Sequence, residues 1–113
     1  VFALTGCGFF SSVPTPVITT DPPLDNNNTV SANVGDTIEF SGENSTDPNN
    51  NIDSYSWNFG TDTHFIQGGS AVETASGEVQ TGSYDATGTY TVSLTVTDAD
   101  GHSDSINVTA DIS

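Results

Sequence analysis

Groups that bind cations dominate the chemistry available to this chain of 113 residues. Asp and Glu total 15, whereas the sequence has two His, no Lys and no Arg. The loop from Asn44 to Asp53 is crowded with carboxylate and amide oxygens, and the turn Asp98-Ala99-Asp100-Gly101 adds further carboxylates. Ca²⁺ takes about six to eight oxygen ligands, so both segments are candidates for a calcium site. The alternative is that Asp47 and Asn50 only form Asx turns with nearby backbone amides.

The charge of the chain restricts its partners. The formal net charge is -15 at pH 7. Without cationic side chains nothing can neutralise phosphates, which excludes nucleic acid as a partner. Attraction of the protein itself to an anionic membrane surface is excluded for the same reason. A second interpretation of the charge is adaptation of an extracellular domain to salty water, where it maintains solubility.

Catalysis is not predicted. Ser, His and Asp all occur, but a chain this polar contains such sets by chance. His64 falls in a segment without clear periodicity, and His102 follows directly after a turn. The sequence has no nucleophile elbow and no paired carboxylates in a context that would form a pocket. We therefore expect a domain that is not an enzyme.

The first residues are similar to the end of a bacterial lipoprotein signal. Leu4-Thr5-Gly6-Cys7 resembles a lipobox, and Val1-Phe2-Ala3 resembles the end of an apolar signal core. This resemblance implies that residues 1–6 are a signal remnant and that Cys7 carries a lipid, which would be the chain's contact with a membrane. A lone Cys cannot form an intramolecular disulfide, which fits that role. The alternative is a chance match.

Residues 7–28 are expected to be a disordered or extended tether. Pro breaks helices and is disfavoured in central strands, and a run of Asn adds a polar turn. The segment Val17-Ile18-Thr19-Thr20 could still join the edge of a sheet. The Pro and Asn positions are Pro14, Pro16, Pro22, Pro23 and Asn26–Asn28.

From residue 29 to residue 113 the pattern is that of an all-β domain. Tyr55, Trp57 and Phe59 alternate with polar residues, as in a half-buried strand. Trp57 is the only Trp, and burying one aromatic side chain removes roughly 150–250 Å² from water, so we place it at the centre of the core. Residues 88–97 and 103–112 also alternate and flank an Asp/Gly turn, which predicts a hairpin. No segment has a helical period.

Several motifs in series resemble the PKD domain family. They are Ser45-Thr46-Asp47-Pro48, Tyr55 to Gly60, Tyr84 to Val92, and Asp98 to Gly101. The resemblance implies an immunoglobulin-like β-sandwich of about seven strands with an accessory, non-catalytic role. The segment from Asp62 to Ser83 is longer than the family pattern, so we expect an extra hairpin or an enlarged loop there. Within it, Phe65 and Ile66 are candidates for exposed apolar contacts.

The resemblance also assigns roles to individual residues. Some PKD-like domains bind Ca²⁺ through Asx residues, which makes a structural Ca²⁺ ion the cofactor to test. Asn58 stands where the family usually has Asp, and this lowers the expected affinity. Tyr84 is expected to tie its hydroxyl to the backbone. The candidate metal ligands are Asn44, Asp47, Asn58 and Asp98, and the expected core residues are Tyr55, Trp57, Phe59, Tyr84 and Tyr90.

The expected function is that of a surface module without chemistry. We expect a bacterial lipoprotein at the cell envelope, facing the periplasm or the exterior, that acts as a spacer or binds protein or polysaccharide. One alternative is an accessory domain of a larger secreted protease or polysaccharide-degrading enzyme. Another is a filament or stalk subunit, in which Val1 to Phe10 would pack as a strand into a neighbouring copy.

Overall fold

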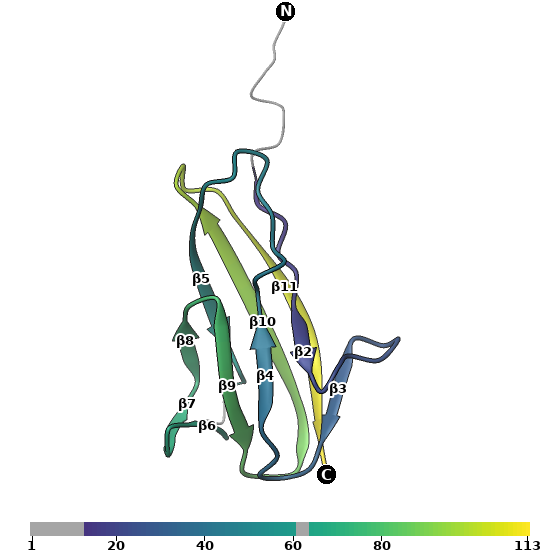
Figure 1. The fold of residues 1–113 in the computed structure, drawn as a ribbon. Coiled ribbons are helices and arrows are strands. Elements are labelled where there is room, and N and C mark those ends of the chain that lie inside the picture. The colour runs from purple at the N-terminus through teal and green to yellow at the C-terminus, as the bar shows by residue number, and fades with distance from the viewer. Residues whose placement is uncertain (1–12, 61–63) are drawn as a thin grey trace, which may run out of the picture.

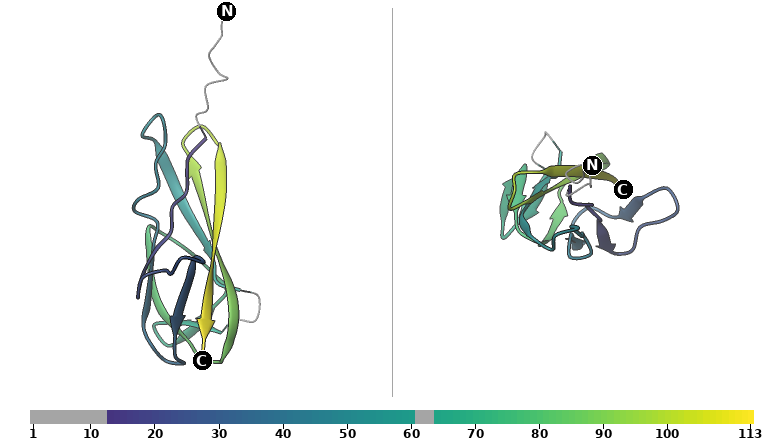
Figure 2. Two further views of the ribbon diagram at one scale, coloured as in Figure 1. Left: turned by 90° about the vertical axis from the view of Figure 1, so that its right-hand side faces the viewer. Right: turned by 90° about the horizontal axis from the view of Figure 1, so that it is seen from above.

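Two five-stranded sheets pack face to face in the computed structural model, which describes residues 13–60 and 64–113 (Figure 1). In the first sheet β11 pairs in parallel with β3, and the other pairs are antiparallel. The view from above in Figure 2 shows the two layers. The strand order of the first sheet is β3 (Thr29–Ala32), β11 (Ser103–Ile112), β10 (Gly88–Asp98), β5 (Ile52–Asn58) and β8 (Thr74–Ser76).

The second sheet holds most of the segment that is longer than the family pattern. β6 and β7 form an antiparallel hairpin, and β6 also pairs with β9. The expected extra hairpin is therefore confirmed, and together with β8 it raises the strand number in the described residues above the predicted seven to ten. The strand order is β2 (Thr19–Asp21), β4 (Ile38–Ser41), β9 (Val79–Tyr84), β6 (Phe65–Gln67) and β7 (Ser70–Val72).

The longest pairing confirms the predicted C-terminal hairpin. β10 and β11 pair from Gly88 opposite Ile112 to Thr97 opposite Ser103. From Val92 to Asp98 every second residue of β10 is buried, as the alternation predicts. Gly101 sits in the connecting turn with φ of 88°, a conformation that glycine adopts without steric cost. This hairpin places Asp98, Asp100 and His102 at one end of the sandwich.

Aromatic rings form a continuous stack through the core. Trp57 is 1% exposed, and the Phe40, Phe65 and Tyr84 side chains are fully buried. Phe59 stacks on Phe65 at 4.1 Å between ring centroids, and Phe65 contacts Tyr84 at 5.0 Å. The Tyr84 hydroxyl donates a 3.0 Å hydrogen bond to the Phe59 carbonyl oxygen, as predicted. Burial, and to a smaller extent nearby Tyr90, raises the pKa of Tyr84 well above its ordinary value.

The other two predicted core residues lie at its margin. Tyr55 and Tyr90 are partly buried and pack against the fully buried set. Tyr55 donates a hydrogen bond of 3.3 Å to a Glu78 carboxylate oxygen. Burial raises the pKa of Tyr55, and the negative charges of Glu78 and Glu43 raise it further. These tyrosines therefore connect the core to the polar surface.

The folded unit begins earlier than the predicted boundary at Thr29. Pro14, Pro16 and Ile18 are buried in alternation, and Thr15 forms a β-bridge with Thr46. β2 then pairs with β4, so the expectation that residues near 17–20 join a sheet edge is confirmed. A tether over all of residues 7–28 is therefore wrong, because alternating burial fixes this segment despite its prolines. Predicted lipidation at Cys7 lies outside the described residues.

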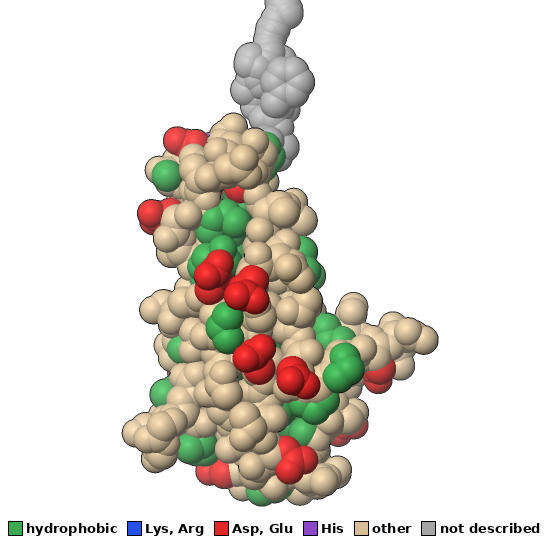
Figure 3. Space-filling model, viewed as in Figure 1, with side chains coloured by type: hydrophobic (Ala, Val, Ile, Leu, Met, Phe, Trp, Pro, Cys, Tyr) green, Lys and Arg blue, Asp and Glu red, His purple; other side chains and the backbone are tan. Residues whose placement is uncertain are grey.

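Acidic side chains gather on the face that carries β2, β4 and β9 (Figure 3). Asp21 and Glu39 are exposed and stand directly opposite each other on β2 and β4. Like charges in such cross-strand pairs are destabilising, and the sequence offers no Lys or Arg to neutralise them.

Within residues 13–60 and 64–113, no helix has the length and apolar character needed to cross a bilayer.

Candidate functional site

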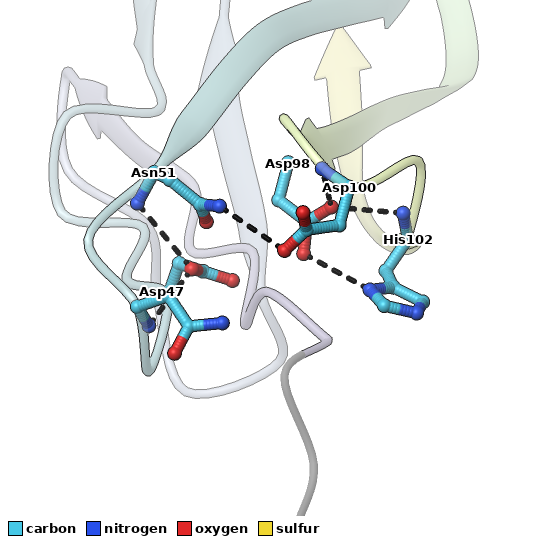
Figure 4. Close-up of polar contacts among 6 residues, drawn as sticks. Asp47, Asn51, Asp98, Asp100 and His102 are labelled. Atoms are coloured by element: carbon cyan, nitrogen blue, oxygen red, sulfur yellow. Dashed lines mark hydrogen bonds and ion pairs between the residues drawn. The ribbon is translucent and has the colours of Figure 1, made fainter. Parts of the chain in front are cut away.

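One candidate site lies where two loops meet at the end of the sandwich. We call it the Asx cluster, and it consists of Asp47, Asn51, Asp98, Asp100 and His102 (Figure 4). Asp47 and Asn51 come from the loop between β4 and β5, and the other three residues come from the end of β10 and the turn into β11. The loops are joined by a backbone hydrogen bond of 2.9 Å from the Ala99 amide to the Asn51 carbonyl.

Asp98 is the buried carboxylate of the Asx cluster. Its residue is 2% exposed. One carboxylate oxygen accepts hydrogen bonds of 2.9 Å from the backbone amides of Asp100 and His102, and the other accepts one of 3.3 Å from His102 Nδ1. Burial alone would raise the pKa of Asp98, but the two amide hydrogen bonds, with help from the His102 ring, lower it on balance. Asp98 is therefore held as an anion in a nearly closed environment.

Asp47 presents a carboxylate oxygen without a protein partner. Its residue is 5% exposed, and Oδ2 accepts hydrogen bonds from the amides of Asn49 at 3.0 Å and Asn51 at 3.4 Å. Oδ1 is buried and has no hydrogen-bond partner, and the same holds for Asn51 Oδ1. Figure 4 shows the Asp47 side chain directed toward the carboxylates of Asp98 and Asp100. Buried polar atoms normally find a partner, so the two oxygens require an explanation.

The Asx cluster is consistent with both interpretations of its residues, Asx turns and a cation site. Asp47 and Asp98 each accept hydrogen bonds from amides two and four residues later, so the predicted Asx turn at Asp47 is confirmed. In addition, Asp98, Asp100 and His102 each bring one ligand atom within 4.8 Å of the others. The orphan oxygens of Asp47 and Asn51 add hard donors of the kind that Ca²⁺ prefers. The turns therefore form a scaffold whose spare oxygens fit a hard cation.

The structure brings together only two of the four candidate metal ligands. Asp47 and Asp98 do share one end of the sandwich, but Asn58 lies at the other end of β5. Ile52 pairs with Asp98, whereas Asn58 pairs with Ser93, and the strand between them spans about 20 Å at ~3.3 Å per residue. Asn44 is exposed, while Asp47 is buried. Asn51 and Asp100 lie in the loop and the turn that the sequence marked as candidate segments, but they were not among the four named ligands, and His102 was not considered as one, although Asp-x-Asp-x-His within one turn was a usable signal.

A second candidate site is a hollow of about 640 Å³ at the other end of β5. We call it the Tyr90 hollow. Its walls come from the end of β5 and its following loop, and from the first half of β10 and the turn before it. No predicted ligand-binding residue marked this place apart from Asn58. The lining residues are Asn58, Gly60, His64, Thr87–Thr91 and Ser93.

Two rings form the aromatic part of the Tyr90 hollow. The Tyr90 ring stacks on buried Tyr84 at 4.1 Å with an angle of 19° between the planes, and His64 meets Tyr90 edge-on at 6.0 Å. His64 Nδ1 lies 2.8 Å from Asp85 Oδ1, and because a carboxylate only accepts, the Nδ1–H donates. The two side chains are 37% and 52% exposed, so this pair orients the His64 ring at the margin of the hollow.

The predicted apolar contact surface at Phe65 is wrong. Phe65 is fully buried because β6 pairs with β9 and places its ring against Phe59 and Tyr84. Ile66, its neighbour on β6, is intermediate in exposure. The segment that is longer than the family pattern therefore contributes a core residue instead of an exposed apolar patch.

Comparison with protein families matches residues 19–113 to the PKD domain. Among solved structures, the chain is similar to the PKD1 domain from the Vibrio cholerae metalloprotease PrtV, with 27% identity and a TM-score of 0.61. That alignment covers 88% of this chain and 96% of that one. The matched range begins at the first residue of β2, in agreement with the early start of the fold.

Two further relatives come from different contexts. A structure described for the promiscuous specificity of carbohydrate-binding modules from the β-sandwich superfamily has a TM-score of 0.71 and 25% identity, covering 89% of this chain and 34% of that one. A microbial collagenase from Vibrio alginolyticus is 44% identical over 68 residues, which are 60% of this chain and 7% of the collagenase. The chain thus spans a small part of this curated relative.

Proposed function

Because the chain belongs to the PKD domain family, we propose that it is a non-catalytic module of an extracellular or cell-surface protein and binds a polysaccharide or protein polymer. The carrying observation is the likeness of its sandwich to the carbohydrate-binding-module structure. The relatives in metalloprotease and collagenase chains support an accessory role outside the cell. The Tyr90 hollow supplies a surface of ligand size.

The direct test is co-sedimentation of the purified chain with insoluble cellulose, chitin and collagen fibrils. We expect retention on at least one polymer at physiological salt. A heat-unfolded sample measures trapping, and a protein of similar acidity without a PKD domain measures non-specific adsorption. Recovery of the whole folded sample in the supernatant with all three polymers would contradict a binding role and leave that of a spacer.

Two contexts for this module are proposed. A lipoprotein context is supported by Leu4-Thr5-Gly6-Cys7, and a place in a larger secreted hydrolase is supported by the collagenase relative. Mass spectrometry of the native protein tests the first, since a diacylated Cys7 at the N-terminus supports the lipoprotein, and the full-length gene tests the second by showing whether a hydrolase domain is encoded with this module. An intact Val1 to Phe10 segment found between subunits of a fibre would instead support the stalk alternative.

We also propose that the Asx cluster holds a structural Ca²⁺ ion. The support is the pair of buried oxygens without partners, Asp47 Oδ1 and Asn51 Oδ1. With the carboxylates of Asp98 and Asp100 they would supply hard oxygen ligands, and the ion would neutralise repulsion among the three carboxylates. Binding to the folded state alone stabilises it by mass action.

A thermal melt tests the ion. We expect Ca²⁺ to raise the melting midpoint relative to excess chelator, and Asp47→Asn to remove most of this response. Asp104→Asn is the matched control, because it removes an exposed carboxylate of β11 outside the Asx cluster. Identical midpoints with Ca²⁺ and chelator, or an equal loss of response in both variants, would show that general charge screening acts instead.

A further inference from the structure

We propose that Asn27 is an acceptor site for N-linked glycosylation. The proposal goes beyond the proposed function and rests on one part of it, the extracellular or cell-surface location, because such glycans are found on surface loops of secreted proteins. The acceptor pattern is Asn, then any residue except Pro, then Ser or Thr. It occurs three times in this sequence, at Asn27-Asn28-Thr29, Asn44-Ser45-Thr46 and Asn107-Val108-Thr109. The structure distinguishes among the three motifs, because an enzyme must reach the whole motif to modify it.

The Asn44 motif is engaged in the fold. Ser45 is 8% exposed, and its hydroxyl oxygen accepts a 2.9 Å hydrogen bond from the Val17 amide. Thr46 exchanges backbone hydrogen bonds of 2.7 and 3.0 Å with Thr15. An enzyme could use this motif only after the segment around Thr15 had left the loop, so the folded protein does not offer Asn44 as an acceptor.

The Asn107 motif lies within a long strand. Asn107 stands opposite Ser93 in the β10–β11 ladder, and its side-chain oxygen accepts a 2.9 Å hydrogen bond from the Ser93 hydroxyl. Thr109 pairs with β10 on one side and with β3 on the other. Bending this motif into an active site would break both ladders, so the folded protein does not offer it either.

The Asn27 motif, in contrast, begins in an exposed loop. The loop joins β2 to β3 and projects from the side of the sandwich (Figure 1). Residues 25–28 are all exposed, and Thr29 is intermediate in exposure. Exposed loops are the places where other molecules reach a folded chain most easily. An enzyme can therefore approach the Asn27 side chain without separating the two sheets.

Hydrogen bonds within the loop keep the motif in a tight turn. Asp25 Oδ1 accepts hydrogen bonds from the amides of Asn27 at 2.7 Å and Thr29 at 3.1 Å, which makes an Asx turn. The Thr29 hydroxyl donates a 3.2 Å hydrogen bond to the Asn27 carbonyl oxygen, so it lies beside the acceptor residue. These three bonds use backbone atoms of Asn27 and Thr29 and the Thr29 hydroxyl. The Asn27 side-chain amide, which would receive the sugar, takes part in none of them.

The reaction joins a sugar to the side-chain nitrogen of Asn27. The co-substrate is an oligosaccharide linked through phosphate to a polyprenol lipid, and an oligosaccharyltransferase of the producing cell is the catalyst. A bond forms between Asn27 Nδ2 and the anomeric carbon of the first sugar. The bond from that carbon to the phosphate oxygen breaks, and the lipid phosphate leaves with the electron pair. Nδ2 gives up one proton to a base of the enzyme, so atoms and charge balance.

Mass spectrometry of the protein isolated from the cells that produce it tests the proposal. Trypsin is unsuitable, because the chain has no Lys or Arg. A protease that cleaves before Asp places the three motifs on separate peptides, residues 25–35, 36–46 and 104–110. We expect a glycan on Asn27 in the first peptide, located by electron-transfer fragmentation, and none on the other two. An unmodified peptide 25–35, or equal occupancy of all three motifs, overturns the proposal.

Variants produced in the same cells assign the modification to one residue. Asn27→Gln should abolish it, and so should Thr29→Ala, because the motif requires a hydroxyl at that position, whereas Thr29→Ser should retain it. Asn26→Gln is the matched control: it changes an exposed neighbour outside the motif and should leave the occupancy unchanged. A glycan that persists on peptide 25–35 in Asn27→Gln, or an equal loss in Asn26→Gln, overturns the assignment.

The polymer experiment separates this proposal from the proposed function. Asn27 lies outside both the Asx cluster and the lining of the Tyr90 hollow, so the two can fail independently. Retention on a polymer by a native protein that carries no glycan refutes the acceptor site while the binding module stands. A glycan on Asn27 in a protein that no polymer retains supports the acceptor site while it contradicts the binding role.

Discussion

The hydroxyl of Tyr84 offers the most sharply defined test of the fold, through the substitution Tyr84→Phe. Its side chain is fully buried and its hydrogen bond to the Phe59 carbonyl is 3.0 Å long. Removing the hydroxyl leaves that carbonyl buried and unpaired, which costs about 1–3 kcal/mol. Domains of this size are stable by only about 5–15 kcal/mol, so the loss is a substantial share.

Urea unfolding followed by Trp57 fluorescence measures this loss, since Trp57 is the only Trp and is 1% exposed. With a urea slope of about 1–2 kcal/mol per M, the midpoint should fall by about 0.5–3 M. Tyr90→Phe is the control: its hydroxyl also bonds a carbonyl, at 2.7 Å, but is only partly buried, so water can replace it at a cost of about 0.5–1.5 kcal/mol. Equal losses in the two variants would refute the reasoning.

The same variant predicts a change at alkaline pH. Because the pKa of folded Tyr84 is raised above its ordinary value of 10.0, its contribution to stability is complete below pH 10 and falls as pH rises further. The unfolded chain then binds fewer protons than the folded one, and stability declines by up to about 1.4 kcal/mol per pH unit. Tyr84→Phe should flatten this decline. An unchanged alkaline slope in the variant would contradict the role assigned to burial.

Three other predictions concern packing and charge. Gly82→Ala should destabilise by about 1–3 kcal/mol, because its Cβ would meet the Ile66 carbonyl and lie 2.7 Å from Phe65 Cζ; Ser83→Ala, in the same strand, should be near neutral by urea unfolding. Ile18→Ala should lower the free energy of unfolding by about 2–4 kcal/mol, because Ile18 is 5% exposed. If it cost less than Thr19→Ala, a change at an exposed residue, the folded domain would begin at residue 29 as predicted from the sequence. Added NaCl should raise the melting midpoint by screening the charge of -15, and an unchanged midpoint would show that repulsion is minor.

Local patterns predicted the elements whose partners are close in sequence. Alternation along β10 and the Gly101 turn were enough for the C-terminal hairpin, because both strands and their turn are contiguous. The Tyr84 hydrogen bond was anticipated from the family resemblance. The burial of Phe65 was not anticipated, because it depends on the pairing of β6 with β9, and the sequence does not show which strands pair.

The proline-rich start of the fold, at residues 14–18, shows a different limit of prediction from sequence. Pro14 and Pro16 argue against a strand when each is judged alone, yet they alternate with Thr15, whose amide bonds the Thr46 carbonyl at 2.7 Å. Proline lacks a donor, so an edge segment in which only every second residue must donate tolerates it. The family resemblance grouped Asn58 with Asp47 and Asp98, but Asn58 lies at the opposite end of β5, because the strand between Ile52 and Asn58 is long.

The two ends of the described fold give the sandwich a mechanical axis. Its first residues enter beside the Asx cluster and its C-terminus leaves at the opposite end (Figure 1). A pull between these ends loads β2 against β4, and β11 against β10 and β3, along the strand direction. In the antiparallel pairs β2–β4 and β10–β11 the ladder hydrogen bonds lie across the strands, so such a pull loads them all at once and does not open them one at a time. A domain placed in line between an anchor and a bound polymer would therefore transmit tension while staying folded.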